Sequence, residues 1–335
     1  MRYLILGGGP AGISAARTLR KAKPDAEIVI ATEETEAPYL RPLLPDLILG
    51  DVDAEMLLDP QGKDLGEKGI RTLAGRIATR LDTGSRRVDF SDGTTEGYDT
   101  LLIATGGRPE VPQALKKGYP AIRVFDSFRD TLAIKERAAL PGGAVVYGPG
   151  YLAIEACRGL RKAKKEVVWI QPDLPREGYP LAGELEASIL DDVRNRGARI
   201  KDGDDIVEVR EKDAANCVVL TRDGGEIPCS LLVVATERVP SVGFLAGSGV
   251  TVGRGVRVDD ALRTSAPGVF AAGDCAEFAD KPTGVGRINF GWRSAIRQGQ
   301  LAGENMAGGK RRFGAEQENY FWALFGYSLM DRAKK

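Results

Sequence analysis

The chain has 335 residues, with 47 basic and 47 acidic side chains and a formal net charge of zero. This balance gives no support for a nucleic acid or an anionic membrane surface as partner, and no apolar run reaches membrane-spanning length. Histidine is absent, which excludes Ser-His-Asp, Cys-His and histidine–metal chemistry. Catalysis therefore either depends on a bound cofactor or is absent.

The cysteine pattern gives no redox or metal motif. None of the four cysteines forms a C-x-x-C pair, so neither a thioredoxin-like motif nor a zinc site is supported, and no metal is expected. We interpret all four as small buried apolar residues. Glycines interrupt the apolar N-terminus and no cleavage-type sequence follows, so we expect a cytoplasmic protein. The cysteines are Cys157, Cys217, Cys229 and Cys275.

The first 34 residues predict a dinucleotide site. Gly7 permits a tight turn, Gly9 permits close approach of a pyrophosphate, and Gly12 permits close packing of helix and strand. An acid after the second strand accepts ribose hydroxyls. A purely structural glycine turn is the alternative. The expected order is a strand over Arg2–Leu6, the loop Gly7-Gly8-Gly9-Pro10-Ala11-Gly12, a helix over Ile13–Arg20, a strand over Glu27–Ala31, and Glu33 and Glu34.

The next segment, Ala37–Asp46, contains three prolines and reads as a loop or a short helical turn. Arg41 within it contacts the cofactor or is a solvated surface charge. Short strands are expected over Ile70–Ile77 and Arg87–Phe90. A further apolar strand ends in the small residues Ala104, Thr105 and Gly106, which suit close approach of the backbone to a ligand.

A second module of the same kind begins about 140 residues after the first, which indicates an internal repeat. Its strand ends at Gln171 rather than at an acid, so the usual partner of a ribose 2′-hydroxyl is missing. Lys164, Lys165 and Arg176 are near enough in sequence to receive a 2′-phosphate, or they are ordinary surface charges. The order is a helix over Phe125–Ala139, a strand over Gly143–Tyr147, the loop Gly148-Pro149-Gly150-Tyr151-Leu152-Ala153, a helix over Ile154–Lys164 and a strand over Glu166–Ile170.

The remaining elements complete the repeat. Leu231–Thr236 mirrors the apolar strand that ends at Thr105, and Asp223–Glu226 is a hairpin turn. A later strand ends in Gly273 and Asp274, where the carboxylate accepts a sugar hydroxyl or caps a turn. Further predicted elements are a helix over Glu184–Arg196, strands over Val207–Arg210, Cys217–Leu220 and Val256–Asp259, and a helix over Gly291–Gly303.

Five segments together resemble the two-dinucleotide flavoprotein reductases of the pyridine nucleotide–disulfide oxidoreductase superfamily. The nearest branch is the rubredoxin reductase, ferredoxin reductase and nitrite-reductase flavin-domain group. The segments are Gly7–Gly12, Pro38–Leu44, Ala104–Pro109, Gly148–Glu155 and Thr264–Cys275.

This resemblance implies an α/β fold with two Rossmann-like, three-layer dinucleotide-binding domains, the NAD(P) domain being inserted into a discontinuous FAD domain. The expected boundaries are 1–110 and 239–310 for the FAD domain, 111–238 for the NAD(P) domain, and 311–335 for an aromatic tail. The tail would be a remnant of the interface domain that the relatives carry. It caps the flavin domain or forms a docking surface, through which a homodimer or a hetero-complex would assemble.

The resemblance also assigns residues to the two cofactors, FAD and NADH or NADPH. Glu33 or Glu34 would hold the adenosine ribose, Ile77 would lie by the adenine, and Trp292 would lie near the isoalloxazine. Arg129 would reach the phosphates, and Asp274 would bind the ribityl chain. The other expected FAD residues are Gly7, Gly9, Pro10, Ala11, Gly12, Arg41, Ala104, Thr105, Gly106 and Gly273, and those for the nicotinamide nucleotide are Gly148, Gly150, Tyr151, Leu152 and Glu155.

One departure from the branch concerns the candidate catalytic residues, Glu155 and Asp46. The branch usually has Ser-Lys after its Arg-Pro-x-Leu segment, and this Lys pairs with the Glu of the second loop. Here those positions are Pro45 and Asp46. Asp46 beside Glu155 would bring two acids together and raise the pKa of one of them, or the loop is rearranged.

The sequence supports an FAD-dependent NAD(P)H oxidoreductase that passes electrons to a protein such as rubredoxin, ferredoxin or an iron–sulfur subunit. The alternative is a flavin-containing assembly or sensor subunit with weak nicotinamide binding and no turnover of its own. Cysteine-based reduction of disulfides or peroxides has no candidate thiolate. The acceptor, the choice between NADH and NADPH, the direction of electron flow and the oligomeric state stay open.

Overall fold

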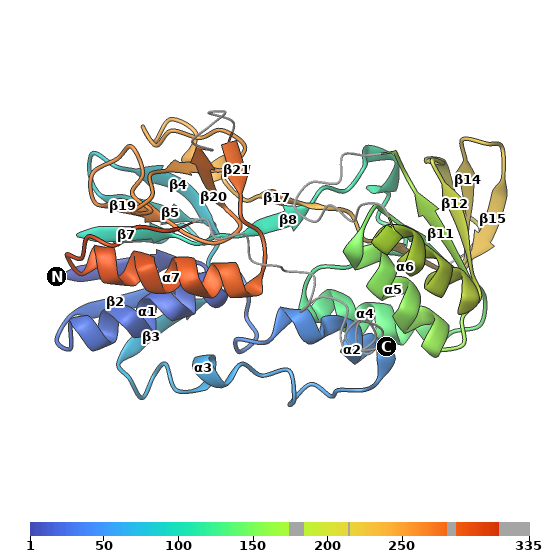
Figure 1. Cartoon of the computed structure of the whole chain (residues 1–335), viewed down its shortest axis with the longest axis horizontal. Helices are drawn as coiled ribbons and strands as arrows, with labels where there is room; N and C mark the ends of the chain where they lie inside the picture. Colours follow the sequence, from blue (N-terminus) through green and yellow to red (C-terminus); the bar gives the residue numbers. More distant parts are fainter. Residues whose placement is uncertain (174–183, 214, 280–285, 315–335) are drawn as a thin grey trace. The chain divides into compact units, whose positions relative to one another are not determined.

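The computed structural model describes residues 1–173, 184–213, 215–279 and 286–314, and they form two compact units (Figure 1). Unit 1 comprises Met1–Tyr39, Leu58–Gly107 and the described residues from Val239 onward, and unit 2 comprises Leu40–Leu57 and Arg108–Arg238. Unit 2 is therefore inserted into unit 1 in sequence, as expected. The structure groups Leu40–Leu57 with unit 2, whereas the predicted boundaries place this segment in 1–110.

Unit 1 is built on a five-stranded parallel sheet of order β19-β7-β1-β2-β3. Side chains alternate along β1, so that Tyr3 and Ile5 pack in the cluster formed by α1 and α7. Leu4 and Leu6 pack in a second cluster with Leu81, Val88 and Phe90 of a small antiparallel sheet. The central strands are buried on both faces, which explains their continuous apolar sequence.

The bounds in unit 1 are β1 Arg2–Leu6, α1 Pro10–Ala22, β2 Glu27–Thr32, α3 Pro60–Lys63, β3 Ile70–Ala74, β4 Ala78–Asp82, β5 Arg87–Phe90, β6 Thr95–Gly97, β7 Thr100–Ile103, a 3₁₀ turn over Gly243–Leu245, β18 Val256–Val258, β19 Val269–Ala271, β20 Ala276–Ala279, β21 Gly286–Ile288 and α7 Trp292–Met306.

Unit 2 repeats this architecture around a five-stranded parallel sheet of order β12-β11-β10-β16-β9. Helices α4, α5 and α6 contact this sheet. Val145 and Ile170 of the sheet pack in one cluster with Val209 and Val219 of the antiparallel strands β13 and β14. The predicted fold class, two Rossmann-like three-layer modules, is confirmed.

The bounds in unit 2 are a 3₁₀ turn over Arg41–Leu43, α2 Leu44–Leu49, a 3₁₀ turn over Gln113–Leu115, β9 Ile122–Val124, α4 Phe128–Ala138, β10 Ala144–Tyr147, α5 Tyr151–Lys162, β11 Val167–Gln171, α6 Glu184–Asn195, β12 Ala198–Asp202, β13 Ile206–Glu211, β14 Cys217–Thr221, β15 Glu226–Cys229 and β16 Leu231–Val234. The segments that pass between the units are β8 Gly107–Pro109 and β17 Arg238–Pro240.

Local chemistry accounts for the differences from the predicted elements. Helix α4 begins at Phe128 rather than Phe125 because Ser127 and Asp130 form a capping box there. Strand β3 ends at Ala74, before Gly75 with its φ of 73°. The hairpin between β14 and β15 is confirmed. Most of the predicted aromatic tail, from residue 315 onward, lies outside the described residues. None of the helices in the described ranges has the length and apolar character needed to cross a membrane.

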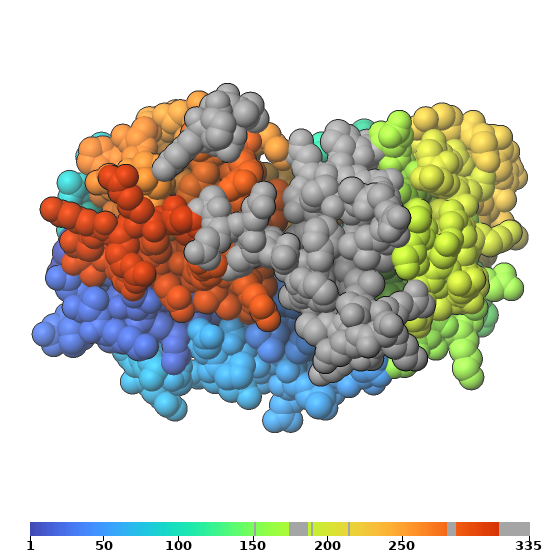
Figure 2. Space-filling view, in the orientation of Figure 1, coloured from blue at the N-terminus to red at the C-terminus, as the bar shows by residue number. Residues whose placement is uncertain are grey.

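Glycines set the distance between α1 and α7. A Cβ at Gly299 would stand 2.1 Å from the Ala11 carbonyl oxygen, and one at Gly303 would stand 2.7 Å from that of Ala15. The two helices therefore pack backbone to backbone, and their outer sides adjoin on one face of unit 1 (Figure 2). This packing fixes the start of α1, where the glycine loop ends.

We predict that Gly299→Ala destabilises the protein by about 1–3 kcal/mol, because α1 and α7 must separate to admit the methyl group. Gly66→Ala is the control: this exposed glycine has nothing within 4 Å of the added Cβ, so its effect should stay within about 0.5 kcal/mol. Chemical denaturation of the two variants measures the difference. Equal losses would contradict the proposed backbone contact.

Candidate functional site

The glycine loop of unit 1 is shaped by two backbone contacts. Gly7, with a φ of 117°, leaves no room for a side chain, since its Cβ would stand 2.1 Å from the Ala104 carbonyl oxygen. A Cβ at Gly12 would stand 2.0 Å from the Gly7 carbonyl oxygen. Gly9 differs, because nothing lies within 4 Å of its Cβ position. The loop is thus closed toward the protein at Gly7 and Gly12 and open at Gly9.

The helix that follows offers its N-terminus to this open space. Gly9 is the N-cap of α1 and supplies no side-chain cap, and Pro10 follows within the first turn. The first N–H groups of a helix have no intrahelical partner, and the dipole makes this end positive. A pyrophosphate fits both features.

Two neighbouring strands end at the same edge of the sheet and bring small residues to it. Ala104 follows β7, and its N–H donates to the Leu6 carbonyl (2.8 Å). Thr105 donates its hydroxyl to the Ser241 carbonyl (2.8 Å). Gly273 follows β19 and lies against Ala11, whose Cβ would be 3.1 Å from a Cβ added there. The structure therefore brings the predicted segments 7–12, 104–106 and 273–274 together.

A buried glutamine missed in the sequence analysis fixes Gly273 in place. Gln298 of α7 is fully buried, and its Oε1 accepts the Gly273 N–H (2.7 Å). Its Nε2 donates to the Ser294 hydroxyl (3.0 Å). Asp274 next to it accepts the Gly291 N–H at the start of α7 (3.2 Å). The signal in the sequence was a polar residue on the apolar face of a helix, between Ala295 and Ala302.

The other residues predicted for the first cofactor fall in two places. Glu33 and Glu34 directly follow β2, and Ile77 adjoins the end of this strand, because the Arg76 N–H donates to the Thr32 carbonyl (2.8 Å). Trp292 is the first residue of α7.

Arg41 and Arg129 belong to unit 2. Arg41 Nη1 donates to the backbone carbonyl (2.7 Å) and to Oδ1 (3.3 Å) of Asp126, and Asp126 also pairs with Arg238. Arg129 lies in the first turn of α4. The predicted phosphate contacts of both arginines stay predictions.

The glycine loop of unit 2 has the same construction. A Cβ at Gly148 would stand 2.2 Å from the Ala235 carbonyl oxygen, and nothing lies within 4 Å of the Cβ position at Gly150. Gly150, with a φ of 78°, is the N-cap of α5 and leaves that N-terminus without a side-chain cap. The predicted residues Tyr151 and Leu152 form the first turn of this helix.

Two buried polar atoms flank this loop and have no hydrogen-bond partner among the described residues. They are Oε1 of Gln171, at the end of β11, and Oγ1 of Thr236, just beyond β16. Both side chains are at most 3% exposed, and strands β11 and β16 lie on either side of β10. A buried polar atom without a partner costs about 1–3 kcal/mol, so a ligand with hydroxyl or amide groups suits this edge. Nicotinamide nucleotides carry such groups.

Two of the cations considered for a 2′-phosphate are at the wrong end of the sheet. Lys164 and Lys165 precede β11, whereas the glycine loop and Gln171 lie at its carboxyl end, about 16 Å away for a five-residue strand. Lys165 also donates its Nζ to the Gly142 carbonyl (3.0 Å). The suggestion that these lysines reach a 2′-phosphate was therefore wrong. Arg176 lies outside the described residues.

The two candidate catalytic acids share one arginine. Both Glu155 carboxylate oxygens accept from Arg158 Nη1, at 2.6 and 2.8 Å. Burial raises the pKa of Glu155, Arg158 lowers it, and Asp46 raises it further. Burial also raises the pKa of Asp46, which Arg158 opposes. The two acids thus interact electrostatically, and Arg158 is a cation beside them that the sequence analysis did not anticipate.

The cysteines are free and buried. Burial raises the pKa of Cys275 to about 11 and also raises the pKa of Cys157. These two side chains are therefore thiols at neutral pH rather than reactive thiolates. Cys217 and Cys229 face each other across β14 and β15 with their Sγ atoms 3.5 Å apart.

These two modules define a protein that binds two dinucleotides. Residues 1–302 match the family model described as pyridine nucleotide-disulphide oxidoreductase, and the chain belongs to this family. The open space at Gly9 fits the pyrophosphate of FAD. The loop at Gly150 fits a nicotinamide nucleotide, since the Gln171 and Thr236 oxygens beside it have no partner in the described part of the chain. The protein is a flavoprotein oxidoreductase that uses FAD and NAD(P)H.

Similar proteins include several reductases of electron-transfer proteins. The ferredoxin reductase subunit of 5,5'-dehydrodivanillate O-demethylase from a Sphingobium species is 34% identical over 82% of this chain and 67% of its own length. NADH-rubredoxin oxidoreductase of Clostridium acetobutylicum is 28% identical over 92% of this chain and 75% of its own length. Among solved structures, the putidaredoxin reductase–putidaredoxin complex superposes with a TM-score of 0.86 at 24% identity, covering 94% of this chain and 77% of the other.

We predict that Gly9→Val weakens FAD binding at least about tenfold, or 1.4 kcal/mol, and leaves the fold intact. The valine side chain would enter the space left for the pyrophosphate, while the φ of −80° at this position suits any residue. Flavin content after purification and FAD titration of the stripped protein measure the effect, and circular dichroism reports the fold. Unchanged flavin affinity would place the pyrophosphate elsewhere.

Proposed function

We propose that this oxidoreductase takes electrons from NADH or NADPH and passes them to a small electron-transfer protein or an iron–sulfur subunit. One observation carries the proposal: each unit has a glycine loop that is closed toward the protein and open toward a helix N-terminus. Two such loops accommodate two dinucleotides at once. Relatives named for their action on ferredoxin and rubredoxin support a protein acceptor.

Unit 1 would hold FAD in this proposal. Gly7, Gly9 and Gly12 would form the turn against the pyrophosphate, with Pro10 and Ala11 in the first helical turn. Glu33 or Glu34 at the end of β2 would accept the adenosine ribose hydroxyls. Ala104, Thr105, Gly106, Gly273 and Asp274 would line the cofactor from the adjacent strand ends, where Gln298 keeps Gly273 in position.

Unit 2 would hold the nicotinamide nucleotide. Gly148 and Gly150 would admit its pyrophosphate to the N-terminus of α5. Gln171 and Thr236 would supply hydrogen bonds to its hydroxyl or amide groups, because their oxygens lie at this edge and meet no partner within the described ranges. Glu155, about one turn into α5, would lie toward the nicotinamide end.

The chain's own residues would bind and orient rather than exchange protons. FAD, when bound, supplies the chemistry that accepts a hydride from NAD(P)H and releases electrons singly. No histidine is present to act as a general base, and the Cys157 and Cys275 thiols are buried. Orientation of the two cofactors by the glycine loops and helix N-termini would account for the protein's contribution.

A second candidate function is a flavin-containing assembly or sensor subunit with weak nicotinamide binding. Two observations favour it: Gln171 stands where an acid usually accepts the ribose hydroxyl, and an acid, Asp46, interacts electrostatically with Glu155. This candidate keeps FAD in unit 1 but predicts no turnover.

We predict that anaerobic mixing with NADH or NADPH bleaches the flavin absorption band within seconds, and that added rubredoxin or ferredoxin restores it. Gly150→Ala should slow this bleaching, because the φ of 78° at Gly150 strains any side chain. Its flavin should still be reduced by dithionite. If neither nucleotide bleaches the wild-type flavin, the oxidoreductase proposal fails and the sensor candidate stands.

A further inference from the structure

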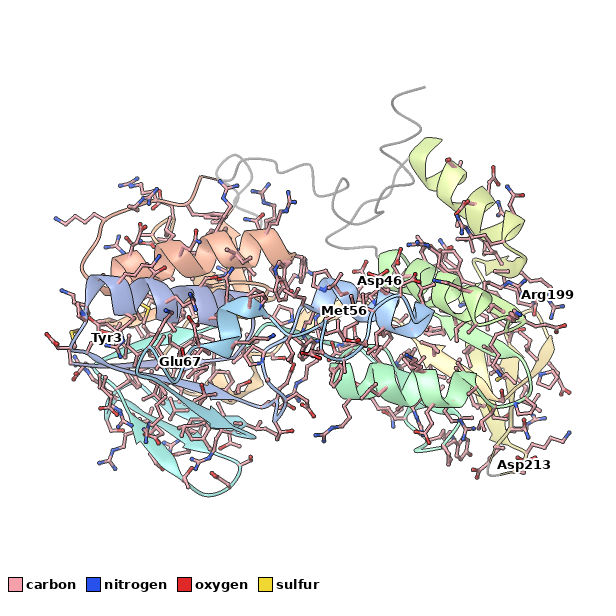
Figure 3. The ribbon with its side chains drawn as sticks, turned by 90° about the horizontal axis from the view of Figure 1, so that it is seen from below. Tyr3, Asp46, Met56, Glu67, Arg199 and Asp213 are labelled. Atoms are coloured by element: carbon pink, nitrogen blue, oxygen red, sulfur yellow. The ribbon has the colours of Figure 1, made fainter. Side chains whose placement is uncertain are left out.

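Helix α2 is fixed against α5 by close packing. A Cβ at Gly159 of α5 would stand 2.7 Å from Cγ2 of Ile48 and 3.9 Å from the Pro45 carbonyl oxygen. One turn later, Lys162 of α5 pairs with Asp51, which follows α2. Figure 3 shows Asp46 on α2, which packs against α5. Asp46 is therefore held at a defined place beside the helix that carries Glu155.

Arg158 is the cation that both acids share. The Glu155 side chain is 4% exposed and accepts both hydrogen bonds from Arg158, whose side chain is 31% exposed. Arg158 therefore extends from the surface to a buried carboxylate. For both Glu155 and Asp46, it is the principal influence that lowers the pKa and so opposes burial.

The other charges near Glu155 do not stabilise its ionised form as Arg158 does. On α2, Asp46 raises the pKa of Glu155, and beyond α6, Arg196 lowers it to a smaller extent. Arg196 is already paired with Asp192. The cation that Glu155 pairs with therefore stands on α5, the same helix as Glu155.

We propose that Arg158 is the positioning residue that holds Glu155 as an ionised carboxylate in one orientation toward the nicotinamide nucleotide. The inference rests on the proposed nucleotide site in unit 2 and adds the group that organises it. An ionised carboxylate only accepts hydrogen bonds, which suits a nicotinamide carboxamide and the positive ring of an oxidised nucleotide. Without Arg158, Glu155 would be buried beside Asp46 with no hydrogen-bonded cation and would take up a proton more readily.

The test is titration of NAD⁺ and NADP⁺ into the oxidised, FAD-loaded protein in a series of buffers from mildly acidic to mildly alkaline pH. Arg158→Ala should weaken binding about tenfold near neutral pH, and the affinity should rise with pH as Glu155 loses its proton. The double variant Asp46→Lys/Arg158→Ala places a cation on α2 and should restore affinity to within about threefold.

Lys162→Ala is the matched control, since it removes a cation one turn further along α5 that pairs with Asp51 rather than Glu155. It should leave binding and its pH dependence unchanged. Thermal unfolding of each variant over the same pH range reports the fold. If Arg158→Ala does not fold, Arg158→Gln serves instead, because it removes the charge but keeps a polar side chain, and it should show the same weakened, pH-dependent binding; wild-type binding by this variant would overturn the inference.

The inference would be overturned if Arg158→Ala bound the nucleotides with wild-type affinity and wild-type pH dependence. It would also be overturned if Arg158→Ala bound them more weakly and the added Asp46→Lys substitution did not restore the affinity. Both outcomes would leave the proposed function standing, because the wild-type protein would still bind the nucleotide. Failure of the wild-type protein to bind either nucleotide would overturn the proposed function together with the inference.

Discussion

A contact between a glycine and a backbone carbonyl recurs in both units and determines the shape of each candidate site. Gly7 lies against the Ala104 carbonyl, and Gly148 lies against the Ala235 carbonyl. A Cβ added at either glycine would stand 2.1 or 2.2 Å, respectively, from the carbonyl oxygen. The N–H groups of Ala104 and Ala235 donate to the last residues of β1 and β10. A side chain at either glycine would separate the central strands at the edge where the loops turn into α1 and α5. Both helix N-termini therefore depend on this contact.

The two units differ in the side chains that surround this glycine–carbonyl contact. In unit 1, the buried Gln298 holds the Gly273 backbone through a neutral hydrogen bond (2.7 Å). In unit 2, a buried carboxylate, Glu155, is held by Arg158, and α2 adds Asp46 beside it. A buried charge is stable only when it is paired. The candidate site of unit 2 therefore depends on one buried ion pair, so substitutions that remove either charge should disturb it.

The sequence predicted the fold well because its signals are local. Glycine spacing, apolar strands of four to six residues and the repeat itself identified both modules. The sequence did not indicate the roles of Gln298 and Arg158. Their contacts with Gly273 and Glu155 become identifiable only when helix packing and rotamers are known. The grouping of Leu40–Leu57 with unit 2 was likewise not predictable, because it depends on the fit of Ile48 against Gly159. Lys164 and Lys165 are close to the second glycine loop in sequence, which suggested a contact with a 2′-phosphate. Sequence distance ignores the length of the strand that separates them from the loop.

The central claim is that unit 1 binds FAD and unit 2 binds the nicotinamide nucleotide. Hydrogen–deuterium exchange of the flavin-stripped protein, with FAD or NAD⁺ added separately, tests it most directly. The account predicts that FAD protects residues 7–13, 104–106 and 273–275, and that NAD⁺ protects residues 148–155 together with the segments at Gln171 and Thr236. Protection of the same unit by both ligands, or FAD protection confined to unit 2, would contradict it.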